Sequence, residues 1–158
     1  MGKALAAARR AAIIAAGFSL GSAELAFAQS APDILTRAGL IGRWSRDCET
    51  AAMGGNPYTI FERVQGGTGA QFRIDAGTTG TIRRIVENVR MLSANTITMR
   101  IKTFPDSEEP MNAEVVIQLE PNRIRAISSV GTDGKFHIRE GKMVSTGNES
   151  PWTNRCPE

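Results

Sequence analysis

Apolar and polar side chains alternate along many short segments of the chain after residue 40. In residues 96–104, Ile97, Met99 and Ile101 fall on one side, and polar residues fall on the other. A repeat of two residues is typical of a half-buried antiparallel strand. The same alternation predicts further strands over residues 57–64, 69–75, 113–120, 122–130 and 135–140.

Turn-forming residues separate these segments. Stretches rich in Gly, Pro, Asn, Asp and Ser lie between the predicted strands. Asp133-Gly134 and Glu140-Gly141 fit tight hairpin turns. The chain after Gly39 is therefore predicted to be a meander of short strands.

Residues 81–92 fit two kinds of element. Their apolar residues recur at a helical spacing, at Ile82, Ile85, Val89 and Leu92. Their β-branched content and their neighbours favour a strand in which the alternation slips by one residue at Arg83-Arg84. We predict a strand with a bulge there, and a helix is the alternative.

A short helix is predicted over residues 29–39. Ser30 or Asp33 can cap it, and Pro32 falls in the first turn, where its missing N–H costs nothing. Gly39 is a typical residue at which a helix ends.

The first 28 residues have the composition of a secretory signal peptide. Lys3, Arg9 and Arg10 precede an apolar stretch over residues 11–20, and Ala26-x-Ala28 is the spacing that signal peptidase cleaves. We expect cleavage near Ala28/Gln29 and a periplasmic or secreted protein. The Arg9-Arg10 pair leaves twin-arginine export open beside the general secretory route.

Removal of this segment changes the charge balance. It holds three of the 19 basic and one of the 16 acidic residues, so residues 29–158 carry a net charge of +1. Such a small charge argues against nucleic acid as a partner. The remaining 130 residues suit one domain, and no later segment is apolar enough over a sufficient length to predict a transmembrane helix.

The two cysteines follow similar short motifs. Trp44-Ser-Arg-Asp-Cys48 and Trp152-Thr-Asn-Arg-Cys156 stand near the two ends of the predicted domain. In an exported chain, one disulfide between Cys48 and Cys156 is the simplest arrangement. Two separate thiols, one of them reactive, are the alternative.

Eight or nine short strands in a meander predict an all-β fold. Closing such a meander into a barrel removes its exposed edges, and the first and last strands then become neighbours. We therefore expect a β-barrel domain over residues 40–158 after a helical segment over residues 29–39. A barrel of eight strands is filled by side chains or holds one small ligand.

The start of the predicted barrel resembles the calycin superfamily, the lipocalins and their relatives. The resemblance rests on Gly42-Arg43-Trp44, which follows the short helix and precedes the meander. It implies that Trp44 plugs one end of the barrel and that an arginine, Arg155 or Arg139, stacks on its ring, a contact worth about 1 kcal/mol. Small bacterial inhibitors of secreted metalloproteases are similar in shape, but their disulfide closes a much shorter loop.

Several large residues are expected to point into the barrel, where they either line an apolar ligand pocket or fill the interior. These predicted lining residues are Tyr58, Phe72, Met91, Met99, Phe136 and Met143.

No catalytic, metal or cofactor site is predicted. His137 is the only histidine and falls on the polar face of its strand, and no carboxylates gather at metal-ligand spacing. The glycine-rich residues 53–57 and 66–69 lead into no helix, so they fit turns better than phosphate-binding loops.

Arginines point outward from many of the predicted strands. They either form a patch for an anionic partner or pair across strands with acidic residues. We favour pairing, with Glu62, Asp75, Glu87, Glu114 and Glu120 as the partners.

These patterns favour a non-enzymatic, exported barrel protein that binds an apolar or amphiphilic small molecule. The alternative is a protein-binding module, such as an inhibitor of a secreted protease, that contacts an envelope protein through residues 29–37 or 104–112. A hydrolase or isomerase that uses His137 is a third hypothesis.

Overall fold

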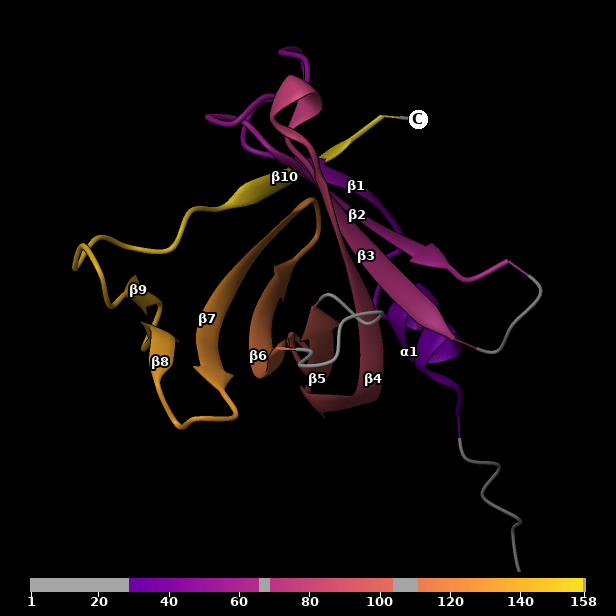
Figure 1. The fold of residues 1–158 in the computed structure, drawn as a ribbon. Coiled ribbons are helices and arrows are strands. Elements are labelled where there is room, and N and C mark those ends of the chain that lie inside the picture. Colours follow the sequence, from indigo (N-terminus) through magenta and orange to yellow (C-terminus); the bar gives the residue numbers. More distant parts are fainter. Residues whose placement is uncertain (1–28, 66–68, 104–110, 158) are drawn as a thin grey trace, which may run out of the picture.

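The computed structural model describes residues 29–65, 69–103 and 111–157. The signal peptide expected over residues 1–28 lies outside these ranges. Within them, eight antiparallel strands form a closed barrel, which confirms the predicted all-β fold (Figure 1). The strands are β1 Gly42–Ser45, β2 Tyr58–Arg63, β3 Ala70–Asp75, β4 Thr81–Ser93, β5 Thr96–Thr103, β6 Met111–Glu120, β7 Arg123–Gly131 and β10 Thr153–Cys156.

Two further strands extend the sheet outside the closed barrel. β8 (Phe136–Arg139) pairs with the end of β7, and β9 (Lys142–Met143) pairs with β8. Figure 1 shows both at the lower left, beside β7. The predicted tight turn joins them, with left-handed φ angles of 52° at Glu140 and 74° at Gly141.

The barrel closes through β10, the last strand. β10 pairs with β1, where Trp44 lies opposite Arg155, and with the start of β7, where Thr153 lies opposite Ile124. The disulfide between Cys48 and Cys156 ties the same seam, with the two Cα atoms 5.3 Å apart. The predicted meeting of the first and last strands and the predicted disulfide are confirmed.

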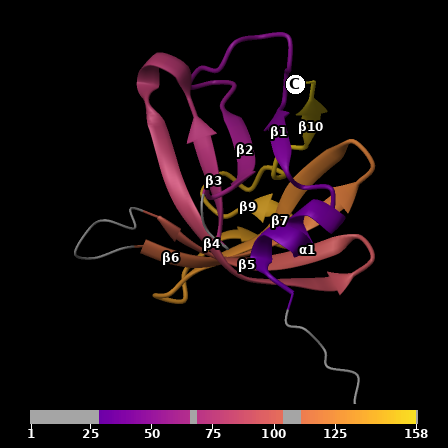
Figure 2. The same ribbon diagram turned by 90° about the vertical axis from the view of Figure 1, so that its right-hand side faces the viewer.

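The N-terminal helix α1 (Ala31–Arg37) packs against one end of the barrel. Figure 2 shows it between the segment that leads into β1 and the strands β4 and β5. Gly39, with a φ of 68°, ends the helix, and the N–H of Leu40 then donates to the carbonyl of Leu35. Leu35 and Leu40 are fully buried, so α1 and the turn after it belong to the core.

Residues 81–92 form a strand, as predicted, but the position predicted for its bulge is wrong. The pairing of β4 with β5 is regular up to Glu87 and shifts between Glu87 and Arg90. Asn88 lies between them with a φ of 49°, a left-handed conformation that asparagine tolerates better than most residues. The alternation before it is uninterrupted, so Arg83 and Arg84 face opposite sides of the sheet.

A second bulge lies in β7. Ile117 of β6 faces Ala126, and the next residue, Val116, faces Ser128, so Ile127 is the extra residue. The inward positions therefore pass from Ala126 to Ser129. Val130 is the neighbour of Ser129 and belongs to the opposite face, although uninterrupted alternation from Ile124 and Ala126 would place it inward.

A short 3-10 helix, η1 (Gly77–Thr79), connects β3 and β4 at the end of the barrel opposite α1. Asp75 accepts a hydrogen bond from the N–H of Gly77 at 2.9 Å, and Gly77 has a left-handed φ of 63°. This turn holds the start of β4 beside β3, which places Arg84 opposite Phe72.

Candidate functional site

The barrel end beside α1 is closed by Trp44. Its indole ring is 2% exposed, and Nε1 donates to the carbonyl of Leu40 at 2.9 Å. The guanidinium of Arg155 lies 5.4 Å from the centre of the Trp44 ring and donates to the carbonyls of Gly39 at 2.6 Å and Ile41 at 2.9 Å. Arg155 and Arg139 were the two candidates for the arginine that stacks on the Trp44 ring, and Arg155 is the one found there.

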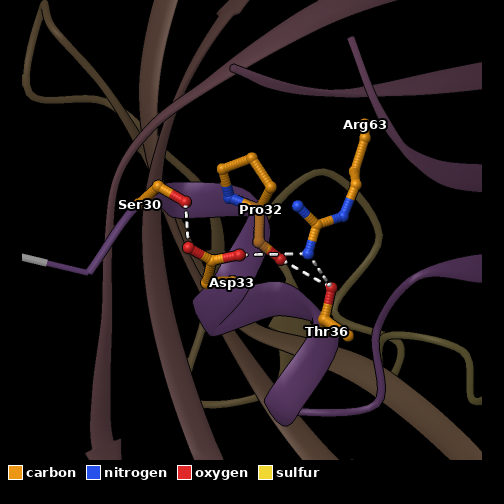
Figure 3. Close-up of polar contacts among 5 residues, drawn as sticks. All are labelled: Ser30, Pro32, Asp33, Thr36 and Arg63. Carbon is orange, nitrogen blue, oxygen red and sulfur yellow. Dashed lines mark hydrogen bonds and ion pairs between the residues drawn. The ribbon is translucent and has the colours of Figure 1, made fainter. Parts of the chain in front are cut away.

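α1 is fixed at this end by contacts to β2 (Figure 3). Arg63, the last residue of β2, donates to the Asp33 carboxylate at 3.1 Å and to the Thr36 hydroxyl at 3.0 Å. The Ser30 hydroxyl also donates to Asp33, so it does not cap a backbone N–H. These bonds, that from Ser30 first and that from Arg63 second, lower the pKa of the Asp33 carboxyl below its usual range.

A cavity of about 360 Å³ lies inside the barrel. Its wall takes residues from β2, β3, β4, β5, β6, β7 and β10, strands that surround the barrel, and it therefore occupies the lumen. The part toward α1 is formed by large apolar side chains. They are Phe61, Phe72, Met99, Ile117 and Ile124.

The cavity wall also contains smaller and more polar residues. Thr59 of β2, Ser129 of β7 and Thr153 of β10 are among them. Ile138 of β8 and the segment Ser150–Pro151 also contribute, because β8 and the chain after β9 fold against the end of β7. The wall of the lumen is therefore mostly apolar with a few polar side chains.

Among the described residues, two arginines and no acidic residue line the cavity. Arg125 is well paired, because its Nε donates to Gln118 at 3.0 Å, and its guanidinium lies 3.6 Å from the Glu149 carboxylate and over the Trp152 ring. Arg84 lies over the Phe72 ring, 5.3 Å from its centre. Within the described ranges its Nε is buried without a hydrogen-bond partner.

The predicted lining residues have different places. Phe72 and Met99 lie in the cavity wall. Tyr58 is buried and donates from its hydroxyl to the carbonyls of Cys48 at 3.1 Å and Thr50 at 2.8 Å. It is not among the residues that line this cavity.

Met91, Phe136 and Met143 also lie outside this wall. Met91 is 42% exposed and borders a surface hollow beside α1, because β4 continues past the end of the barrel. Phe136 and Met143 belong to β8 and β9, which stand outside the closed barrel. The arginine on Phe136 is Arg139, the other candidate for the Trp44 ring.

Sequence reasoning missed Arg84. The alternation Ile82-x-Arg84-x-Val86 could have indicated an inward arginine, but the bulge predicted at Arg83-Arg84 broke that pattern. Val86 is 3% exposed, and its partner across the sheet is the fully buried Ala70, which confirms the direction of this face.

Two of the five predicted acidic partners, Glu62 and Glu120, pair with outward arginines. Among the described residues no ion pair joins an arginine to Asp75, Glu87 or Glu114. Arg73 lies 2.8 Å from the Glu62 carboxylate, and Arg123 lies 2.6 Å from that of Glu120. These pairs are partly exposed and contribute little to stability. They account for part of the arginine content without an anionic partner.

Candidate chemistry outside the cavity is sparse in the part of the chain that the structure describes. His137 is exposed on β8. No group of three His, Cys, Asp or Glu side chains in this part lies close enough together to hold a metal ion. No helix in residues 29–65, 69–103 or 111–157 has the length and hydropathy needed to cross a membrane.

Comparison with known proteins gives no relative: no family model, curated protein or solved structure matches this chain. The closed eight-stranded antiparallel barrel is consistent with a calycin-like barrel. We therefore infer the function from the cavity and from Arg84 in its wall.

Proposed function

We propose that this protein is an exported, non-enzymatic binding protein of the calycin type that carries an apolar or amphiphilic small molecule in its barrel. The cavity in the lumen is the observation that supports this proposal most. At about 360 Å³ it falls within the size range of small-molecule pockets. Its wall combines large apolar side chains with few polar ones, the usual composition of such a pocket.

Binding rather than catalysis is favoured by the residues of the cavity wall. A hydrolase or isomerase needs groups that donate and accept protons at the reacting atoms. The described residues that line the cavity include no carboxylate, histidine, cysteine or lysine. The planar guanidinium group of an arginine is better suited to binding anions than to transferring protons.

Export is supported by two separate features. Residues 1–28 have the charge and apolar pattern of a signal peptide. The disulfide between Cys48 and Cys156 is of the kind that forms and persists in the periplasm or outside the cell. Together they favour a periplasmic or secreted protein.

Inhibition of a secreted protease is less well supported. One of its two candidate contact segments, residues 29–37, contains α1, which packs into the barrel end through the fully buried Leu35. A segment that closes the barrel is a poor inhibitory arm, because binding a protease would require it to leave the core. The other candidate segment, residues 104–112, lies outside the described residues except for Met111 and Asn112.

Two adjacent serines of β7 provide the test. Ser129 lines the cavity, and Ser128 faces the other side of the sheet. Phenylalanine at residue 129 would fill the lumen, whereas at residue 128 it would remain outside. Calorimetric titration with 1-decanol should show binding to the wild type and to Ser128→Phe, and at least a tenfold weaker affinity for Ser129→Phe.

Circular dichroism and urea denaturation would establish that both variants keep the barrel. Native mass spectrometry of protein purified from the envelope of its own cells should in addition detect a bound molecule of low mass. An unliganded protein with no affinity for 1-decanol, or equal affinities for the two serine variants, would contradict a ligand site in the lumen.

A further inference from the structure

Arg84 projects into the barrel because of its place in β4. It lies opposite Phe72 of β3, which lines the lumen, and it is two residues from Val86, which belongs to the core. Arg83, its neighbour, is exposed on the other face. Two adjacent positions of β4 therefore place one arginine on the surface and the other inside the barrel.

The guanidinium of Arg84 has no polar partner among the described residues. No hydrogen bond or ion pair joins it to any of them, and its Nε is buried. The guanidinium makes a cation–π contact with the face of the Phe72 ring. Arg125, the other arginine of the cavity, has an amide oxygen, a carboxylate and an indole ring as partners.

Arg84 is half-buried, and a charge that is partly buried without a polar partner is unfavourable for folding. Burial removes water from the guanidinium and lowers the pKa of Arg84. An apolar side chain would fill the same place without this cost. A group that weakens the empty barrel and faces its cavity is well placed to recognise a ligand.

We propose that the ligand is a single-chain amphiphile with an anionic head group, carboxylate or phosphate, which pairs with Arg84. Such oxygen anions match the planar guanidinium and can accept two parallel hydrogen bonds from it. The alkyl chain extends toward α1 along Phe61, Met99 and Ile117. This inference rests on the proposed binding function and specifies the class of ligand.

The volume of the cavity limits the length of the chain. A water molecule takes about 30 Å³, and a methylene group is of similar size. A cavity of about 360 Å³ therefore accommodates roughly a dozen non-hydrogen atoms. Decanoate, with ten carbons and two oxygens, is the matching probe, and longer chains would protrude from the lumen.

A series of ten-carbon compounds separates the head group from the chain. Wild-type protein would be titrated with decanoate, decyl phosphate, 1-decanol and decylammonium at fixed pH and salt. We expect the better of the two anions to bind at least tenfold more tightly than 1-decanol, and decylammonium to bind more weakly than 1-decanol. Comparison of the two anions identifies the preferred head group.

The adjacent arginines provide matched variants. Arg84→Met should bind 1-decanol within about threefold of the wild type and lose the preference for anions. Arg83→Met removes the same charge from the outer face of the same strand and should keep that preference. Arg84→Lys keeps the charge without the planar fork, so it should retain part of the preference.

Equal affinities of wild-type protein for 1-decanol and both anions would overturn the proposal, because Arg84 would then be already paired or out of reach of the head group. An undiminished preference in Arg84→Met would overturn it as well. In both cases, binding of 1-decanol would still support the proposed binding function. If none of the four compounds binds, the proposed function itself fails.

Discussion

Arg83 and Arg84 are neighbours in sequence with opposite surroundings. Arg83 lies on the outer face, opposite Arg73 of β3 and in water. Arg84 lies on the inner face, over Phe72 and against the cavity. A residue type that is ordinary on a barrel surface becomes a specific feature when the register places it inside.

The position of Arg84 predicts a conflict between stability and binding. Without ligand, Arg84→Met should raise the free energy of unfolding by about 1–2 kcal/mol, because it removes a half-buried charge whose Nε has no hydrogen-bond partner among the described residues. Urea denaturation of the ligand-free protein measures this change. Arg83→Met is the control and should change stability by less than about 0.5 kcal/mol. A destabilisation of Arg84→Met by more than about 2 kcal/mol would mean that Arg84 holds the barrel together.

Arg155 should stabilise the closed end of the barrel. Arg155→Met would lose the hydrogen bonds to Gly39 and Ile41 and the contact with the Trp44 ring, at an expected cost of about 1–3 kcal/mol. Arg139→Met is the matched control, since Arg139 is exposed and lies over the exposed Phe136. Equal unfolding midpoints in urea for the two variants would contradict a role of Arg155 at this end.

At the scale of elements, α1 closes the barrel through both apolar and polar contacts. Leu35 places the apolar face of α1 in the core, Leu40 in the turn after it is also buried there, and Arg63 joins the polar face of α1 to β2. The polar contact involves a titratable group, Asp33. The contribution of this contact to the free energy of unfolding should therefore depend on pH.

The pKa of Asp33 is lower in the folded protein than in the unfolded chain. The stabilisation that it provides is therefore present above about pH 4, where the unfolded chain is ionised, and is lost as the pH falls through the lower folded pKa. NMR titration of the Asp33 carboxyl carbon should give a midpoint below that of a model peptide. Ser30→Ala should raise the midpoint more than Arg63→Met, because the Ser30 hydrogen bond is the larger cause. A wild-type midpoint at the model-peptide value would contradict these contacts.

The strands were predictable from the sequence, because a repeat of two residues persists wherever one face of a sheet is buried. β5 is the clearest case, with Ile97, Met99 and Ile101 all nearly or fully buried. The bulges were not predictable in position. A bulge at Asn88 or Ile127 shifts the pattern by one residue, and the packing of neighbouring strands decides where that shift falls.

The residues of the cavity were only partly predictable for the same reason. Phe72 and Met99 follow from the alternation of β3 and β5. Arg84 was obscured by the misplaced bulge. The places of Phe136 and Met143 depend on β10, which joins β1 to β7 and leaves β8 and β9 outside the closure, a long-range pairing without a local signal.

At the scale of the molecule, the barrel depends on a seam between the two ends of the described chain. The disulfide joins residues 108 positions apart across this seam. It restricts nearly the whole domain in the unfolded state, while β10 itself contributes only four residues, Thr153–Cys156, to the closure.

Removing the disulfide should therefore destabilise the barrel strongly. Cys48→Ala/Cys156→Ala should lower the free energy of unfolding by about 3–5 kcal/mol, by the loss of a constraint on the unfolded chain. Urea denaturation compares it with the wild type, and reduction of the wild type by a thiol reagent should produce the same shift. A loss below about 1 kcal/mol would show that the seam holds without the bond.

The most direct measurement for the account as a whole is a crystal structure of the protein with 10-bromodecanoate, in which the anomalous signal of bromine locates the end of the chain. We expect bromine inside the barrel on the side of Met99 and Ile117, with the carboxylate against the Arg84 guanidinium. Bromine found only on the outer surface, with the lumen closed by repacked side chains, would contradict it.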